Sequence, residues 1–157
     1  MFTQQSGAGT LTGSGHNFVL DFGTLLLGSS GVSADLAVLN EVLGSADLLD
    51  GSFGLTPDHF LLSGFDPFAN ISAGELFDGL LVSLADTSTA GLFSADVVLQ
   101  AFGHNASGYS GSLGNFNLHI QAQIASSTVP EPDTLALMVA ALLMMPLLSR
   151  RRAGKVK

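Results

Sequence analysis

Short apolar runs alternate with polar residues along residues 16–125, and clusters of Gly, Ser, Thr, Asn and Asp separate these runs. The clearest run is FNLHIQAQI (116–124), in which every second residue is apolar. A period of two over nine residues predicts a half-buried strand. The stretches GLFSADVVLQAF (91–102) and HNFVLDFGTLLLG (16–28) show the same alternation. We therefore expect three long strands in these segments.

Four shorter segments also have the pattern of strands, and they lie at 34–42, 48–53, 59–63 and 76–84. The stretch SADLAVLNEVLGSADLLD (33–50) leaves a helix open as an alternative, because its leucines also fall near a 3.6-residue period. Gly44 and the neighbouring Gly-Ser pairs interrupt such a helix, so we favour the strand. Seven strands in about 110 residues predict an all-β fold, an immunoglobulin-like antiparallel β-sandwich.

Three Gly-rich or Pro-containing segments differ in composition from the predicted strands of the sandwich (16–125). Two of them flank the sandwich, and one lies within it. Residues 1–15 are polar and Gly-rich, and we expect them to be flexible. They contain neither a basic nor an apolar region of a signal peptide, so we expect a truncated or mis-started reading frame. GHNASGYSGSLGN (103–115) reads as a loop, because Gly and Asn supply positive φ angles. Residues 126–134 read as a linker, in which prolines fix the backbone.

The C-terminal segment 135–157 begins with an apolar run and ends with a basic cluster. Residues 135–148 contain no charge, and Pro146 is their only helix breaker. As a helix this run would be about 21 Å long, shorter than the ~30 Å hydrocarbon core of a bilayer. All five Lys and Arg residues of the chain follow it, within 150–157. Since basic residues stay on the cytoplasmic side, we expect a single hydrophobic helix with the body outside the cytoplasm.

A buried amphipathic helix with a basic end is the alternative for this segment. It fits poorly, because apolar side chains would surround the helix on every side. The predicted membrane residues are Leu135, Leu137, Met138, Val139, Leu142, Leu143, Leu147 and Leu148. The predicted basic stop consists of Arg150, Arg151, Arg152, Lys155 and Lys157.

The order VPEP-x-T, apolar run and RRR resembles the PEP-CTERM sorting signal of Gram-negative bacteria. The residues that match its box are Val129, Pro130, Glu131, Pro132 and Thr134. The resemblance implies that an exosortase, a membrane-embedded transpeptidase-like protease, reads the box and processes the tail. Pro146 and the extension AGKVK depart from the family pattern.

Two stretches of the body resemble the immunoglobulin-like choice-of-anchor domains of exported bacterial proteins. They are LDFGTLLLGSSGVSADLAVLN (20–40) and GLFSADVVLQAFGHNASGYSGSLGNFNLHIQAQI (91–124). Together they cover about half of the body.

The lack of basic residues in the body limits the classes of partner that it can bind. Residues 1–128 contain 11 Asp or Glu and no Lys or Arg. Nucleic-acid binding depends on Lys and Arg contacts with phosphates, so we expect no nucleic acid as a partner. Ion pairs in the body would need a protonated His. With no Cys in the chain, disulfides and thiolate chemistry are excluded.

Candidate chemistry in the body is sparse. We interpret the four histidines as solvated, with no H-x-H or H-x-x-x-H spacing for a metal, and they are His16, His59, His104 and His119. Loop oxygens that would suit calcium come from Asp47, Asp50, Asp66 and Asn70. No D-x-D-x-D-G loop is present, and Asx turns explain these residues without a metal. No G-x-S-x-G, GxGxxG or P-loop motif occurs. We therefore expect no catalytic residue, no metal and no cofactor.

The sequence thus predicts a non-enzymatic exported protein. Its tail would hold it in the inner membrane transiently until an exosortase processes it. The body would then reach the cell surface or the extracellular polysaccharide matrix. A carbohydrate- or calcium-dependent adhesion module, using the loop carboxylates and residues 103–115, stays open as an alternative. A small hydrolase is a third hypothesis, without a motif to support it.

Overall fold

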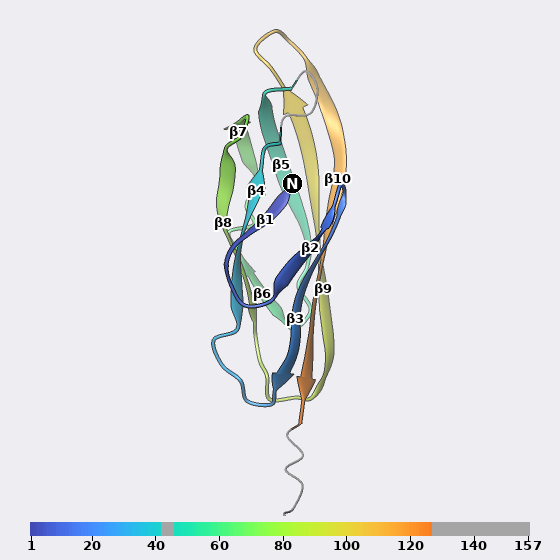
Figure 1. Cartoon of the computed structure of the whole chain (residues 1–157). Helices are drawn as coiled ribbons and strands as arrows, with labels where there is room; N and C mark the ends of the chain where they lie inside the picture. The colour runs from blue at the N-terminus through green and yellow to red at the C-terminus, as the bar shows by residue number, and fades with distance from the viewer. Residues whose placement is uncertain (42–45, 127–157) are drawn as a thin grey trace, which may run out of the picture. The chain divides into compact units, whose positions relative to one another are not determined.

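Strands in two sheets make up the body of the molecule (Figure 1). The computed structural model describes residues 1–41 and 46–126. The linker from residue 127 onward, the hydrophobic helix and the basic stop that the sequence predicts lie outside the described residues. The strands are β1 (Phe2–Gly7), β2 (Thr10–Ser14), β3 (Asn17–Leu26), β4 (Ser33–Leu39), β5 (Leu48–Thr56), β6 (Phe60–Ser63), β7 (Phe68–Ser72), β8 (Leu76–Leu84), β9 (Gly91–His104) and β10 (Ser110–Ala125).

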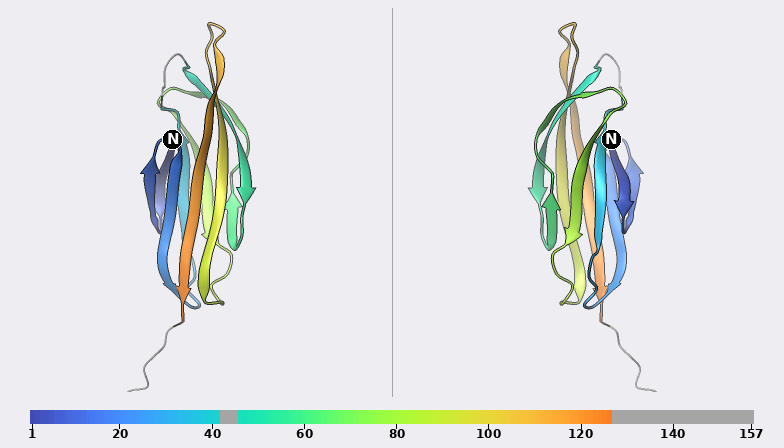
Figure 2. Two further views of the ribbon diagram at one scale, coloured as in Figure 1. Left: turned by 90° about the vertical axis from the view of Figure 1, so that its right-hand side faces the viewer. Right: turned by 90° about the vertical axis from the view of Figure 1, so that its left-hand side faces the viewer.

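The two sheets face each other across one hydrophobic core (Figure 2). The smaller sheet has the order β1-β4-β8-β6, and the larger sheet has the order β2-β3-β10-β9-β5-β7. All neighbouring strands pair antiparallel except β3 and β10, which run parallel. The long strands β9 and β10 occupy the centre of the larger sheet and pair along most of their length.

Apolar side chains of both sheets fill the space between them. The largest fully buried ones are Leu20, Leu36, Leu80, Leu99, Leu118, Ile120, Val38, Val82 and Val97. Aromatic rings join the sheets directly. The ring of Phe2 in β1 meets that of Phe18 in β3 edge-on at 5.7 Å, and Phe68 in β7 stacks on Phe77 in β8 at 4.5 Å. The described core therefore consists of Leu, Val, Ile, Phe and Ala, and the chain contains no Trp.

The prediction of an all-β sandwich is confirmed. Each of the seven predicted segments contains a strand, and these are β3, β4, β5, β6, β8, β9 and β10. The alternative helix over 33–50 is wrong, because residues 33–39 form β4. Four of its seven side chains are completely buried, and three of them, Ala34, Leu36 and Val38, belong to the core. This burial stabilises the strand more than leucine helix propensity opposes it.

Three features of the fold correct the predictions. Residues 1–15, which we expected to be flexible, form β1 and β2, and Phe2 is only 2% exposed. The short strand β7 was not predicted, because Phe68 is its only buried residue. The sandwich is also not purely antiparallel, since β3 pairs parallel with β10. The described residues thus hold more strands than the seven that we expected.

The segment 103–115 is a hairpin rather than a loop. Strand β9 continues to His104, and β10 begins at Ser110. The side-chain oxygen of Asn105 accepts hydrogen bonds from the backbone N–H groups of Ser107 and Tyr109, both at 3.0 Å. Such an Asx turn closes the hairpin locally. Most of the Gly and Ser residues that suggested a loop lie on these two strands, and Ser107 and Gly108 lie in the turn between them.

Candidate functional site

The residues of the predicted sorting signal lie outside the described residues. This holds for the box at 129–134, the apolar run at 135–148 and the basic stop at 150–157. The positions and partners of these residues stay predictions from the sequence. The geometry that follows concerns the body.

Polar side chains form rows across the outer face of the larger sheet. We call this surface the polar face, and it consists of Asn17, Asp21, Ser94, Asp96, Asn117, His119 and Gln121. The strand register places these residues side by side, because β10 pairs with β3 on one side and with β9 on the other. Successive side chains of a strand point to opposite faces, so the core residues Leu118 and Ile120 alternate with them.

Hydrogen bonds connect the polar face from strand to strand. The amide of Asn117 donates to the side-chain oxygen of Asn17 at 3.1 Å. Two residues further along β10, Nδ1 of His119 donates to the carboxylate of Asp96 at 2.8 Å. These pairs fix the orientation of exposed side chains, which makes the face an ordered surface of donors and acceptors.

Asp21 is the most strongly held carboxylate of the polar face. The backbone N–H of Gly23 donates to it at 2.7 Å, and the amide of Gln121 donates at 2.9 Å. These two bonds, with that of Gly23 the larger cause, hold the pKa of Asp21 below its usual value of 3.8. The carboxylate therefore stays charged at all but acid pH.

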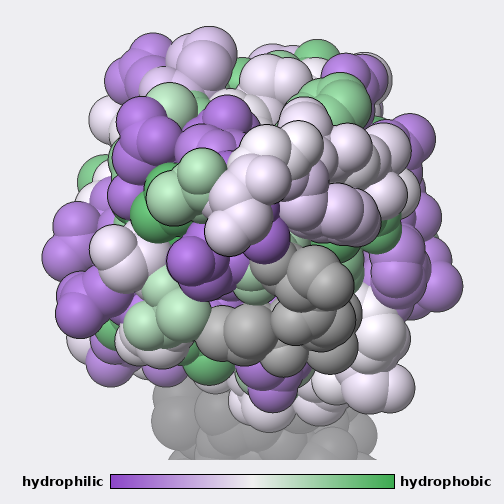
Figure 3. All heavy atoms as spheres, turned by 90° about the horizontal axis from the view of Figure 1, so that it is seen from above, coloured by the Kyte–Doolittle hydropathy of each residue, from purple (hydrophilic) through white to green (hydrophobic). Residues whose placement is uncertain are grey.

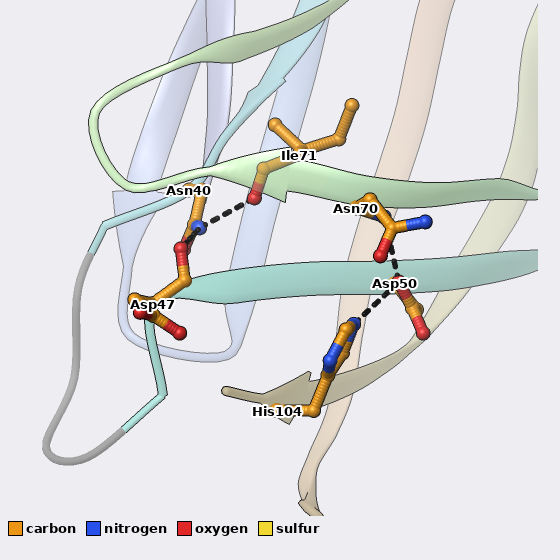
Figure 4. A network of polar contacts seen from close by, with 6 residues as sticks. All are labelled: Asn40, Asp47, Asp50, Asn70, Ile71 and His104. Atoms are coloured by element: carbon orange, nitrogen blue, oxygen red, sulfur yellow. Dashed lines mark hydrogen bonds and ion pairs between the residues drawn. The ribbon is translucent and has the colours of Figure 1, made fainter. Parts of the chain in front are cut away.

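A second polar cluster lies at one end of the sandwich (Figure 4). Strand β5 begins there, and strands β7 and β9 end there. The buried amide of Asn40 donates to the carbonyl oxygens of Ile71 at 2.8 Å and Asp47 at 3.3 Å. This side chain thereby joins the end of β4 to β7 and to the segment before β5. It closes one end of the sandwich.

The carboxylate of Asp50 lies beside this network. It accepts a hydrogen bond from the backbone N–H of Asn70 at 2.7 Å, and Nε2 of His104 lies 3.2 Å from the same oxygen. Asn70 has a positive φ of 59°, which Asn tolerates better than most residues. The bond from its N–H to Asp50 helps to hold this conformation.

The calcium hypothesis placed four oxygen donors in loops, and the structure places two of them on neighbouring strands. Asp50 lies in β5 and Asn70 in β7, so these two were wrongly placed in loops. Asp66 follows β6, and the backbone oxygen of Asp47, rather than its carboxylate, takes part in the Asn40 network. Among the described residues, no group of three or more His, Cys, Asp and Glu side chains could hold a metal ion.

The histidines lie at four separate places. His119 points outward from β10 as predicted, and His16 lies in the turn between β2 and β3. His104, which we expected in a loop, is the last residue of β9. His59 lies between β5 and β6, and its Nε2 is 3.7 Å from Asp58. In the described residues, every side-chain ion pair involves a His, as the lack of Lys and Arg in the body required.

The His–Asp pair of the polar face and the one beside the Asn40 network were missed by the sequence analysis. His119 and Asp96 are 23 positions apart, and His104 and Asp50 are 54 apart. The outward position of His119 on a strand was visible in the alternation. Its partner was not, because strand register is needed to identify the residue opposite it.

A cavity of about 220 Å³ opens between the sheets near the Asn40 network. Apolar side chains line most of it, among them Leu49, Leu99 and Phe116. The ring of His16 stacks on that of Phe116, with ring centres 4.4 Å apart. The cavity is thus a gap at the end of the core with one imidazole at its wall.

These observations define the class of the body as a two-sheet β-sandwich with an ordered polar outer face. No family model matches the chain, and no curated protein matches it. Within the part of the chain that the structure describes, no helix has the length and apolar character to cross a membrane.

Proposed function

We propose that this chain is a non-enzymatic, exported bacterial protein of the cell surface or extracellular matrix, sorted through a PEP-CTERM signal. The observation that carries the proposal is the order of the tail: Pro-Glu-Pro box, apolar run and basic cluster. In this proposal the body is a choice-of-anchor domain of immunoglobulin-like type.

The charge distribution supports the proposal. The body has no Lys or Arg before residue 150, and the basic residues that would hold a helix end in the cytoplasm are concentrated in the tail. A body without Lys and Arg is free of the charges that oppose translocation across the inner membrane. The exported part would be acidic and would stay soluble through its own charge.

In the proposed sequence of events the apolar run holds the chain in the inner membrane. The box at 129–134 then lies between the exported body and the bilayer. An exosortase cleaves the chain near this box, and the body leaves without the apolar run. The last residue of β10 is Ala125, so the cut would fall outside the folded strands.

Replacement of the box tests this function. Changing Pro130, Glu131 and Pro132 together to Ala should leave an unprocessed form in the inner membrane. Changing Ser126, Ser127 and Thr128 to Ala is the matched control, because it alters the linker beside the box and should leave processing intact. Cell fractionation with detection of the body measures both. A box variant that matures and localises like the wild type would refute the sorting function.

The polar face favours a second candidate, binding of a neutral polysaccharide. Its amide, carboxylate and imidazole groups are held in rows by cross-strand hydrogen bonds, and such ordered donors and acceptors suit sugar hydroxyls. Phe102 points outward from the same strand as Asp96 and is 47% exposed, so a sugar ring has an apolar surface to contact. Anionic polysaccharides would be repelled by the acidic body.

Calorimetry with neutral and with anionic matrix polysaccharides tests this candidate. We expect heat with the neutral polysaccharide, and a loss of at least about tenfold in affinity for His119→Ala combined with Gln121→Ala. Leu81→Ala on the smaller sheet is the control. Heat that is absent with the neutral polysaccharide, or unchanged in the double variant, removes the candidate. Heat that appears only with added Ca²⁺ would favour the calcium-dependent form of the module.

A further inference from the structure

Three exposed leucines lie at the end of the body where the chain leaves the sandwich. Their exposed fractions are 61% for Leu26, 45% for Leu27 and 76% for Leu92. Leu26 ends β3, Leu27 follows it, and Leu92 is near the start of β9. We call these three residues the exit patch.

Strand pairing brings the exit patch together around the last residues of β10. Leu26 pairs with Ala125, and Leu92 pairs with Gln123. Because residues 123 and 125 of one strand point to the same face, their partners share that face too. The backbone N–H of Leu27 donates to the carbonyl oxygen of Ala125 at 3.0 Å, which fixes Leu27 at the same point.

The opposite end of the body has a different surface. Figure 3 shows that end, where hydrophilic residues cover most of the surface and apolar ones are interspersed. The exit patch itself contains no charged side chain. Two acidic residues lie near it: Asp21 lines a shallow pocket together with Leu92. Asp86 precedes Thr87, whose backbone oxygen accepts a hydrogen bond from the N–H of Gly28 at 3.0 Å.

The length of the linker between β10 and the apolar run limits how far the exit patch can lie from that run. Residues 126–134 separate the end of β10 from the apolar run at 135–148. Nine residues span at most about 30 Å when fully extended. On the proposed function, on which this inference rests, the run at 135–148 lies in the inner membrane. The exit patch is then always within about 30 Å of a lipid surface.

We propose that the exit patch is a lipid-contacting surface, through which the tethered body rests on the outer side of the inner membrane. Leucine side chains leave water at the boundary between headgroups and acyl chains. The tether makes this contact intramolecular, so three leucines suffice where they would not recruit a free protein. Processing of the tail removes the tether, and the contact is lost when the body is released.

Charge decides which lipids allow the contact. Asp86 and the acidic body are repelled by anionic headgroups, and no Lys or Arg in the body offsets this repulsion. We therefore expect the exit patch to lie closer to phosphatidylcholine bilayers than to bilayers rich in phosphatidylglycerol. High salt should reduce the difference between the two.

The absence of cysteine in the chain allows a direct test with single-cysteine variants. Leu92→Cys places an environment-sensitive fluorophore in the exit patch. Tyr109→Cys, at a position 43% exposed in the hairpin turn at the other end, is the matched control. Both full-length proteins are reconstituted with phosphatidylcholine vesicles, and flotation is measured together with quenching by a lipid-dissolved quencher. We expect both to float and the label at position 92 to be quenched at least about threefold more than that at 109.

The outcomes separate this inference from the proposed function. Full-length protein that floats, with equal and weak quenching at positions 92 and 109, overturns the lipid contact and leaves the tether intact. Protein that does not float contradicts both. A label at 92 that is shielded without vesicles, in protein that elutes as a dimer, identifies a second copy as the occupant and also overturns the proposal. Leu26→Ser with Leu27→Ser should lower the quenching at 92 and leave flotation unchanged.

Discussion

At the scale of single residues, Asn40 shows how much one buried amide can stabilise this fold. Its side chain is 5% exposed and donates both amide protons to backbone oxygens, those of Ile71 and Asp47. Because the amide is buried and makes two hydrogen bonds, losing Asn40 should cost more than losing one ordinary hydrogen bond.

Asn40→Leu should therefore lower the free energy of unfolding by about 1–3 kcal/mol, since it leaves two carbonyl oxygens without their donor. Urea unfolding measures the change. Asn117→Ala is the control, because its amide bond to Asn17 lies on the exposed polar face and should contribute less than about 0.5 kcal/mol. Equal effects of the two variants would mean that the Asn40 network does not hold this end of the sandwich.

The bonds of Asp21 predict a dependence of stability on acid. Because its pKa is lowered in the folded state by Gly23 and then by Gln121, the charged form is favoured by folding. This contribution is complete above the usual pKa of 3.8, and it is lost as the pH falls through the lower folded value.

Denaturation midpoints measured from about pH 5 down to pH 2 should fall less in Asp21→Asn than in the wild type. Gln121→Ala should lie between them, since the bond from Gly23, the larger cause, remains. Identical acid profiles of Asp21→Asn and the wild type would show that this carboxylate does not couple to folding.

The position of a side chain could be predicted from the sequence only where the local pattern of apolar and polar residues determines it. The outward position of His119 followed from alternation. Its bond to Asp96 and the bond of His104 to Asp50 join distant strands, so they depend on register. Asn40 gave no signal, because an Asn after an apolar run is as typical of a turn as of a buried bridge.

At the scale of elements, Gly51 fixes how closely β5 and β7 approach. A Cβ atom at this position would lie 2.4 Å from Cζ of Phe68 and 2.7 Å from Cδ1 of Leu99. The ring of Phe68 is 8% exposed and stacks on Phe77, so it has little room to move. Glycine is required here by space, rather than by its backbone freedom.

Gly51→Ala should lower the free energy of unfolding by about 1–3 kcal/mol, because the core must shift to admit the methyl group. Gly54→Ala is a matched control in the same strand. Its Cβ would meet only the carbonyl oxygen of Val98, at 3.9 Å. We expect that variant to be neutral or stabilised by up to about 1 kcal/mol. Thermal and urea unfolding of both variants give the comparison, and a neutral Gly51→Ala would contradict the close packing of β5 on β7.

The strands that sequence analysis predicted are those with many core residues. β10 alternates over its whole central part, and this period identified it. β1 and β7 each place a single buried Phe in the core, Phe2 and Phe68, and the rest of each strand is polar or exposed. Edge strands of this kind resemble loops in composition. The parallel pairing of β3 with β10 could not be predicted, because alternation is the same in parallel and antiparallel pairs.

At the scale of the whole molecule, all Lys and Arg residues lie in one short segment, 150–157. The acidic residues are spread over a body whose described ion pairs all use His. Apolar burial and backbone pairing must therefore supply the stability of the sandwich. The core residues that the structure describes all lie within residues 1–126, which form one compact unit.

The sorting signal could be proposed from the sequence because its three parts follow each other along the chain. No tertiary contact is needed to recognise a box, an apolar run and a basic cluster. The polar face and the exit patch could be identified only from the strand pairing, since their residues come from strands far apart in sequence. Sequence therefore predicted the proposed route of the protein, and the fold was required to locate surfaces on its body.

The intact mass of the protein recovered from the surface or matrix of its bacterial host tests the sorting function most directly. Intact protein must be measured, because trypsin has no Lys or Arg to cleave at before Arg150. We predict a species that has lost the apolar run 135–148 and the basic residues 150–157, and whose remaining part carries no Lys or Arg. A surface protein whose mass retains the chain through Lys157 would contradict processing at the tail, and with it the central claim.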